Sequence, residues 1–257
     1  MSRFRVVIPA RFASMRLPGK PLLKIAGRPM IRWVWERAVA SGAVEVLIAT
    51  DHDDIADACR AFGAEVCMTD AGHASGTDRI AEVAATRGWD DAEVVVNVQG
   101  DEPLLPPALV QQVAELLLHT DADVGTLGTP IHSLADYLDT NVVKLVARQD
   151  GAALYFSRAP IPWHRDGAVA GLSSQQRFAS ALRHLGLYSY RVGALRRLAA
   201  TPPCVLEEIE RLEQLRALWL GMRIQVDVAM EAPPAGIDTP ADLERVSRLL
   251  AARLPEG

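Results

Sequence analysis

A ten-residue stretch near the N-terminus concentrates positive charge in a way that suits phosphate binding. RFASMRLPGK (11–20) directly follows FRVVIPA, and it carries Arg11, Arg16 and Lys20 with no acidic residue. Arginine offers a planar fork of donors to a phosphate, and lysine offers a mobile point charge. The stretch contains neither GxxxxGK[ST] nor GxGxxG, so its side chains, rather than a glycine-rich cradle, would hold the anion.

Two acidic stretches supply oxygen ligands of the kind that a metal ion beside such a phosphate needs. NVQGDEP (97–103) places Asp101 and Glu102 at the end of an apolar run, and GIDTPADL (236–243) places Asp238 just before a predicted helix. Mg²⁺ favours one or two carboxylates together with substrate phosphates and water. Cations and a metal site together describe a clamp for a nucleoside triphosphate.

Each stretch also has a plainer interpretation, and both interpretations are open at the level of the residues. The loop at 11–20 can be a solvated basic surface. Asp101 and Glu102 can open the next helix, where their charge complements its dipole, and Asp238 can do the same before the last helix. Two such loops on adjacent strand ends favour the clamp.

The first half of the chain alternates short apolar runs with longer segments of helical periodicity. The predicted strands span 4–10, 44–50, 65–69 and 93–99, and the predicted helices span 29–42, 53–63, 76–88 and 106–119. Near-continuous apolar strands are typical of parallel sheets covered on both faces. A βαβ series of this kind binds ligands beyond the carboxyl ends of its strands, which is where the charged loops fall.

The pattern loosens in the second half of the chain. We predict a hairpin turning at Asp150-Gly151, strands at 184–191 and 222–230, and helices at 206–221 and 239–254. Thr239 followed by Pro240 is a typical helix start. No linker or repeat divides the chain, so we interpret the segment at about 130–190 as a lobe of one domain spanning 1–257.

The bulk composition excludes several classes of protein. The chain is 49% hydrophobic and 23% charged, which argues against disorder. Its net charge of −5, from 27 basic and 32 acidic residues, disfavours nucleic acid as a partner. No run approaches the length of a membrane span, and the 3 cysteines are dispersed without metal spacing. We therefore expect a cytoplasmic protein with no membrane partner.

Several longer stretches carry a resemblance that covers nearly the whole chain in order. They are VVIPARFASMRLPGKPL, ATDHDDIA, EVCMTDAGHASGTDRIAEV, VVNVQGDEP, ALYFSRAPIPW, RHLGLYSYR, LEQLRALW and GIDTPADLERV. They resemble the 3-deoxy-manno-octulosonate cytidylyltransferases, or CMP-Kdo synthetases. The first stretch and QGDEP are shared with other cytidylyltransferases, whereas YFSRAPIPW, HLGLYSYR and LEQLR are typical of the Kdo enzymes.

The resemblance implies a fold and a reaction. The fold is α/β, a Rossmann-like, mixed but mainly parallel sheet with helices on both faces, of the nucleotide-diphospho-sugar transferase type, with a smaller inserted lobe. The reaction joins CTP and Kdo (3-deoxy-D-manno-octulosonate) to give CMP-Kdo and pyrophosphate, with Mg²⁺ as cofactor, for lipopolysaccharide biosynthesis. Such enzymes are typically homodimers.

The resemblance also implies roles for individual residues. The CTP phosphates would be bound by Arg11, Arg16 and Lys20, and the cytidine would be bordered by Ser75, Arg79 and Gln99. Mg²⁺ would be carried by Asp101 and Asp238, which with Arg11 and Lys20 form the implied catalytic set. The sugar would be bound by Arg158, His184, Tyr188, Glu213 and Gln214.

Other functions stay open beside this one. Another acidic sugar, such as 8-amino-Kdo or an acylneuraminate, could be the substrate of the same clamp. A non-catalytic nucleotide-binding relative is a different class of protein, and the presence of Lys20, Asp101 and Asp238 together disfavours it. A dinucleotide-dependent oxidoreductase is disfavoured because no GxGxxG follows the first strand. Asp227 in the last strand either competes for the metal or faces solvent.

Overall fold

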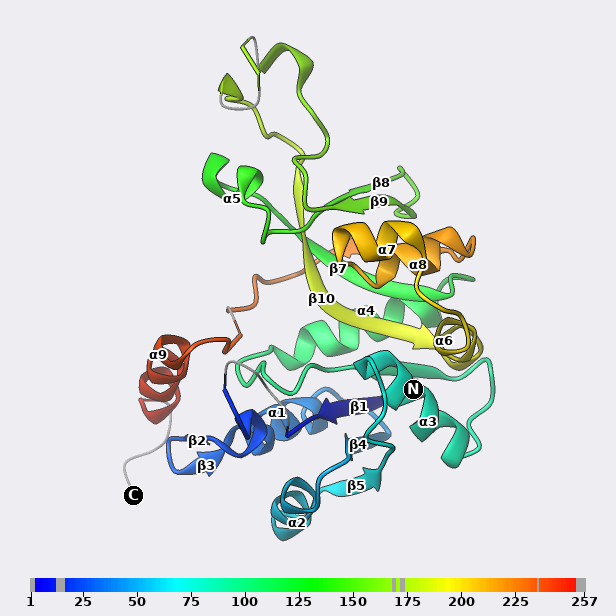
Figure 1. Ribbon diagram of the computed structural model, residues 1–257, viewed down its shortest axis with the longest axis vertical. Coiled ribbons are helices and arrows are strands. Elements are labelled where there is room, and N and C mark those ends of the chain that lie inside the picture. Colours follow the sequence, from blue (N-terminus) through cyan, green and yellow to red (C-terminus); the bar gives the residue numbers. More distant parts are fainter. Residues whose placement is uncertain (1–2, 13–16, 168–169, 172–173, 235, 253–257) are drawn as a thin grey trace.

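One mixed sheet forms the centre of the molecule (Figure 1). The computed structural model describes residues 3–12, 17–167, 170–171, 174–234 and 236–252. The strands of the nine-stranded sheet are β1 (Phe4–Ala10), β4 (Glu45–Thr50), β5 (Glu65–Met68), β6 (Val94–Asn97), β7 (Val124–Pro130), β8 (Lys144–Ala147), β9 (Ala153–Ser157), β10 (Leu182–Arg191) and β11 (Ile224–Val228). A separate ribbon consists of β2 (Lys24–Ile25) and β3 (Arg28–Pro29).

Helices pack around this sheet. The α-helices are α1 (Met30–Val39), α2 (Asp53–Ala61), α3 (Gly76–Thr86), α4 (Pro107–Leu118), α5 (Leu134–Leu138), α6 (Val192–Ala199), α7 (Val205–Glu210), α8 (Gln214–Trp219) and α9 (Pro240–Ala251). The 3₁₀ turns η1 (Lys20–Leu22) and η2 (Arg165–Gly167) also lie in the described segments. Within the described part of the chain, no helix combines the length and the apolar character that crossing a membrane requires.

The strand order places a ligand-binding position beside β1. β1 pairs in parallel with β4 on one side and with β6 on the other, and β4 continues in parallel to β5. The chain therefore adds β4 and β5 on one side of β1 and then crosses to add β6 on the other side. Open α/β sheets bind ligands at such a switch point, outside the carboxyl ends of the strands. The loops that follow β1 and β6 flank this point.

The apolar strands are explained by two cores, one on each face of the sheet. Val6 and Ile8 of β1 belong to a core that includes residues of α1, α2 and α4. Val7, between them, belongs to a second core that includes residues of α3, α6 and α8. Because successive side chains of a strand point to opposite faces, a strand covered on both sides must be apolar throughout. The predicted mixed sheet with helices on both faces is confirmed.

The long strand β10 joins this body to the region that we interpret as a lobe. β10 runs antiparallel to β6 and β7, and its first residues also pair with β8. β8 and β9 form the predicted hairpin, in which Gly151 has a φ of 81° that glycine adopts without strain. In Figure 1 this hairpin and α5 lie in the upper part of the molecule.

The predicted single helix at 206–221 is wrong, because α7 and α8 occupy this segment. Arg211 between them adopts the left-handed conformation, with a φ of 55°. The buried Arg216 of α8 lies 3.1 Å from a carboxylate oxygen of Glu207 in α7, so an ion pair holds the two helices against each other. The break creates a second helix start inside a segment whose periodicity is helical throughout.

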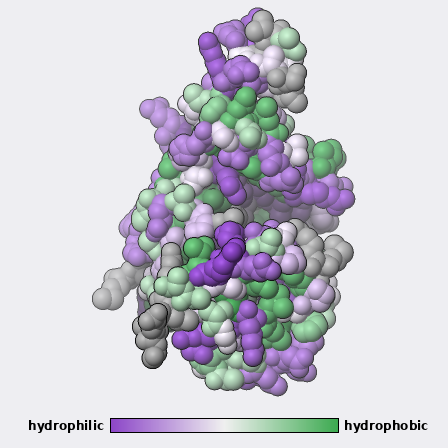
Figure 2. Space-filling model, turned by 90° about the vertical axis from the view of Figure 1, so that its left-hand side faces the viewer, coloured by the Kyte–Doolittle hydropathy of each residue, from purple (hydrophilic) through white to green (hydrophobic). Residues whose placement is uncertain are grey.

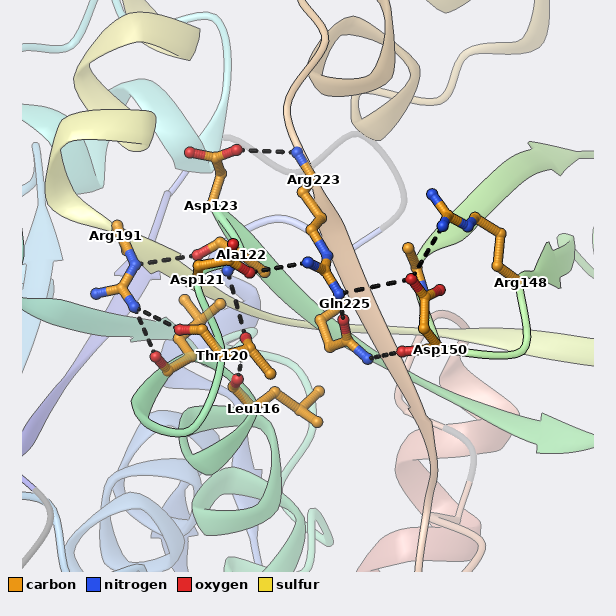
Figure 3. A network of polar contacts seen from close by, with 12 residues as sticks. Leu116, Thr120, Asp121, Ala122, Asp123, Arg148, Asp150, Arg191, Arg223 and Gln225 are labelled. Carbon is orange, nitrogen blue, oxygen red and sulfur yellow. Dashed lines mark hydrogen bonds and ion pairs between the residues drawn. The ribbon is translucent and has the colours of Figure 1, made fainter.

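A polar network ties the C-terminus of α4 to the adjoining strands (Figure 3). Arg191, the last residue of β10, donates hydrogen bonds to the carbonyl oxygens of Leu117 and Thr120, each at 2.8 Å, and of Ala122 at 3.0 Å. A cation at this end of a helix also complements the helix dipole. Arg223 extends the network to β11.

We expect Arg191→Met to lower the free energy of unfolding by about 2–3 kcal/mol, because carbonyl groups lose a charged donor while the apolar stem is retained. Urea denaturation measures the effect. Arg148→Met is the matched control, since Arg148 in the same network is largely exposed and pairs with Asp150 at the surface. Its cost should stay below about 0.5 kcal/mol. Equal losses of unfolding free energy in the two variants would contradict the stabilising role that we assign to the hydrogen bonds of Arg191.

Candidate active site

A backbone hydrogen bond joins the two described ends of the basic loop that follows β1. The backbone N–H of Gly19 donates to the carbonyl of Phe12 at 3.1 Å, and Gly19 has a φ of 65° that favours glycine. The Phe12 ring stacks on His52, with ring centroids 4.0 Å apart. Arg11 precedes this closure and Lys20 follows it, so the loop returns to the sheet edge from which it left.

Lys20 meets two carboxylates that come from opposite parts of the chain. Its Nζ lies 2.7 Å from Oδ2 of Asp101 and 3.5 Å from Oδ1 of Asp238. A backbone hydrogen bond from Ile237 to the Asp101 carbonyl, at 3.1 Å, fixes the C-terminal segment beside the loop that follows β6. Both carboxylates therefore face one point, at which a positive charge already lies.

Close packing of the backbone brings the two strand ends together. A Cβ on Gly100 would lie 3.0 Å from the carbonyl oxygen of Pro9, tighter than such contacts normally are. Glycine is therefore needed in QGDEP for β6 to lie this close to the end of β1.

A cavity of about 330 Å³ opens where these groups meet. It is lined by Pro9, Ala10, Arg11, Lys20, Pro21, Gly76, Gln99, Gly100, Asp101 and Asp238. Figure 2 views the molecule from the side on which α9 lies in Figure 1 and shows a hollow between the upper and lower parts of the surface. One cavity thus holds most of the predicted phosphate and metal residues.

The acidic pair fits a divalent cation that is shared with a substrate. No cluster of three or more histidine, cysteine or acidic side chains suited to a metal occurs among the described residues. Two carboxylates that converge on one cation are the donor set that Mg²⁺ uses when phosphates and water complete its shell. Asp227 is remote from this pair, since it accepts a hydrogen bond from Gln112 at 2.8 Å on the exposed end of β11.

A second, smaller cavity adjoins the first. It measures about 160 Å³ and is lined by Gly76, Thr77, Asn97, Gln99, Tyr188, Tyr190, Glu213 and Gln214. Gly76 and Gln99 line both cavities, so the two are neighbours at the N-terminus of α3. The Thr77 hydroxyl donates to the Glu213 carboxylate. Burial raises the pKa of Tyr188 and Tyr190, so both phenols stay neutral.

His184 lies behind Tyr188, next to this second cavity. The two rings are 5.3 Å apart, and His184 lines a separate cavity that also includes Glu102 and Arg183. Its Nε2 is 3.1 Å from the Thr126 hydroxyl. Burial lowers the pKa of His184 to about 3, which leaves the ring neutral. Burial and the neighbouring Asp101 raise the pKa of Glu102 to about 7.

The other predicted contact residues take different positions. The Arg79 guanidinium is fully buried and donates to Asp51 at 2.8 Å, so it does not line either cavity. Arg158 donates to the carbonyl oxygens of Glu210 and Thr140, away from both cavities. Arg79 is therefore inside the protein, whereas Arg158 is half-buried, and the described linings of the two cavities include neither arginine.

Two further predictions complete the comparison with the sequence. Ser75 caps α3, and its hydroxyl accepts from the backbone N–H of Asp78 at 3.1 Å. It lines a fourth cavity, of about 490 Å³, which also includes Glu213 and therefore adjoins the second. Arg16 lies outside the described residues.

Four residues of the second cavity were not identified from the sequence: Gly76, Thr77, Asn97 and Tyr190. Asn97 did carry a signal, because it is the one polar residue within the run VVVNV (94–98). Tyr190 lies two residues beyond Tyr188 in β10, so both side chains are on the same face of the sheet. Thr77 follows the helix cap at Ser75 and could not be distinguished from an ordinary first-turn residue.

The geometry is that of an α/β enzyme acting on nucleotides, since cations and paired carboxylates gather at the switch point of the sheet. Comparison with known proteins agrees. A model of the cytidylyltransferase family matches residues 5–224. The chain is 56% identical to 3-deoxy-manno-octulosonate cytidylyltransferase of Thioalkalivibrio sulfidiphilus, over 97% of this chain and 99% of the relative. For the enzyme of the same name from Pseudomonas fluorescens the identity is 54%, over 98% and 99%.

A solved structure shares the whole fold. CMP:2-keto-3-deoxy-manno-octonic acid synthetase complexed with CTP superposes with a TM-score of 0.87 at 39% identity, covering 99% of this chain and 100% of the other. The chain therefore belongs to the cytidylyltransferase family, in the group of the 3-deoxy-manno-octulosonate cytidylyltransferases.

We expect the His184 ring to remain neutral throughout the pH range 5–8. An ordinary histidine has a pKa of about 6.5 and changes charge in this range, whereas burial disfavours the charged ring here. NMR titration of the ring protons measures the effect, with His184→Gln used to assign the signal. A midpoint between pH 5 and 8 would show instead that the ring gains a proton at the active site.

Proposed function

We propose that the protein transfers the cytidylyl group of CTP to the anomeric hydroxyl of Kdo, giving CMP-Kdo and pyrophosphate. The proposal rests on one observation: Arg11, Lys20, Asp101 and Asp238 line a single cavity. This cavity adjoins the second one, whose lining is mostly polar and includes the acidic residue Glu213. Relatives of 52–56% identity that bear the name of this activity support the choice of sugar.

The first cavity binds the triphosphate. Arg11 and Lys20 hold the phosphate oxygens and neutralise the charge that builds up on pyrophosphate as it leaves. Gln99, at the boundary of the two cavities, lies where nucleotide and sugar meet. Phosphoryl chemistry of this kind depends mainly on positioning and on charge neutralisation.

Asp101 and Asp238 would hold Mg²⁺. The ion, when bound, neutralises charge at the α-phosphate and lowers the pKa of the attacking hydroxyl. The Lys20 ammonium lies 2.7 and 3.5 Å from oxygen atoms of the same two carboxylates. Lys20 would therefore exchange its carboxylate partners for phosphate oxygens when the nucleotide enters.

The second cavity binds the sugar. Tyr188, Glu213 and Gln214 line it and offer hydrogen bonds to a polyol. The buried, neutral His184 supports the Tyr188 ring from behind. Arg158 and Arg79 stabilise the framework in this proposal rather than touching the substrates. Homodimer formation and a role in lipopolysaccharide biosynthesis accompany the activity in our proposal.

The proposed reaction predicts pyrophosphate release from CTP and Mg²⁺ only when Kdo is added. Parallel reactions contain 8-amino-Kdo or N-acetylneuraminate, and EDTA should abolish release. Release with one of the other sugars instead would retain the nucleotide site and change the sugar. If CTP binds but no sugar supports release, the protein is a non-catalytic nucleotide-binding relative.

We expect Asp101→Asn to reduce kcat at least about 100-fold, because one of two charged metal ligands is lost. The melting temperature should change little, since the Asp101 side chain is 38% exposed and its ion pair with Lys20 is partly screened. Asp227→Asn is the matched control and should keep wild-type turnover, because Asp227 lies outside the cavity. Full activity of Asp101→Asn would remove this residue from the metal site.

A further inference from the structure

Helix α7 has little apolar anchorage of its own. It is six residues long, Val205–Glu210, and none of the six is buried. Val205 and Ile209 are 53% and 73% exposed, and Leu206 packs against a core while remaining partly exposed. A helix this short does not form in isolation, so contacts with the rest of the protein must hold it in place.

Glu210, the last residue of α7, supplies such contacts at the end of β9 (Figure 1). Its carboxylate accepts a hydrogen bond from the buried Ser157 hydroxyl at 2.6 Å and another from the backbone N–H of Arg158 at 2.9 Å. Its carbonyl oxygen accepts a third, from Nε of Arg158 at 2.7 Å. Hydrogen bonds to a charged group are stronger than those between neutral groups, so Glu210 ties α7 firmly to the hairpin.

The end of β9 is itself held by a buried lysine. Lys144 in β8 is completely buried, and its ammonium donates to the carbonyl oxygens of Arg158 and Val142, each at 2.6 Å, and of Asp139 at 2.8 Å. The backbone of Arg158 is therefore bonded on both sides, through its N–H to Glu210 and through its carbonyl to Lys144. Glu210 is thus attached to a fixed part of the hairpin.

The residue that follows Glu210 shows that this junction is constrained. Arg211 has a φ of 55°, which is unfavourable for a residue with a Cβ and persists where the surroundings enforce it. The Arg211 side chain is exposed, so the constraint comes from its neighbours: Glu210, bonded to β9, and Leu212, buried in the core. Directly after Leu212, Glu213 and Gln214 begin α8 and line the second cavity.

We propose that Glu210 is a positioning residue. By bonding the end of α7 to the β8–β9 hairpin, it fixes the turn at Arg211 and so sets where Glu213 and Gln214 lie in the wall of the second cavity. The Glu210 carboxylate is used within the protein and touches no substrate. Its effect on the sugar rests on the proposed function, whereas its effect on the junction does not.

The kinetic test compares two substitutions of Glu210. Glu210→Ala removes both acceptor oxygens, whereas Glu210→Gln keeps an oxygen for the Arg158 N–H and an amide that can donate to the Ser157 hydroxyl. We expect Glu210→Ala to raise the KM for Kdo about 10-fold, because the cavity wall is displaced, and to leave the KM for CTP unchanged. Glu210→Gln should stay close to the wild type. A contact that served only stability would instead lower the active fraction, and therefore kcat, without changing either KM.

A second measurement needs no substrate. Hydrogen exchange followed by NMR reports on the backbone N–H groups of Leu212 and Leu215, which bond to the carbonyl oxygens of Glu207 and Leu212 at the junction. Exchange of these groups should be about 10-fold faster in Glu210→Ala and unchanged in Glu210→Gln. Ser157→Ala, which removes one donor to Glu210, is the milder variant and should shift both readouts in the same direction.

Glu208→Ala is the matched control, since Glu208 is an exposed carboxylate on the same helix. It should match the wild type in both KM values and in exchange. Unaltered exchange in Glu210→Ala would overturn the proposal, whatever the sugar. Faster exchange with an unaltered KM for Kdo would overturn the link to the sugar cavity, and equal effects of Glu210→Gln and Glu210→Ala would show that charge, rather than position, matters. A wild-type protein that releases no pyrophosphate with Kdo refutes the proposed function, while exchange still decides the role of Glu210.

Discussion

The Lys20 ammonium lies between carboxylates from residues 101 and 238, and much of the surrounding packing serves to hold these three groups together. Each comes from a separate part of the chain: Lys20 from the start of η1, Asp101 from the loop after β6, and Asp238 from the segment before α9. Opposite charges at this separation attract strongly only where water is limited. The Lys20 side chain is 13% exposed, so the attraction is effective.

The neighbouring backbone explains why the cluster is stable in place. Ile237 is completely buried among apolar residues of α1, and its N–H bonds to Asp101, which anchors the segment on one side. Thr239 begins α9 with a capping box, which anchors it on the other. Asp238 lies between a buried residue and a helix cap. Its backbone therefore has little freedom, although its side chain is largely exposed.

The fold was largely predictable because strands covered by a core on each face must be apolar throughout, and such runs are visible in the sequence. The charged stretches directly follow these runs, so they could be placed in the loops at the strand ends. The meeting of Lys20 and Asp101 was predictable because the parallel strand ends that precede them share an edge. The position of Asp238 beside them followed only from the family resemblance, because this residue precedes α9 and does not follow a neighbouring strand. The break at Arg211 was not predictable, because the whole segment has helical periodicity. The division into two helices depends on the left-handed conformation of Arg211 and on the ion pair between Arg216 and Glu207. The burial of Arg79 on Asp51 likewise depends on a tertiary contact.

β10 is hydrogen-bonded over its length to body strands and, at its first residues, to the hairpin above them. β10 therefore connects the central sheet to the β8–β9 hairpin. Its pairing with β7 is interrupted between Leu185 and Tyr188, and Gly186 within this gap has no neighbour that a Cβ would touch. A β-bulge bends its strand locally. Because His184 and Tyr188 flank this irregularity, its geometry sets how the two rings lie against each other, and with them the wall that Tyr188 contributes to the second cavity.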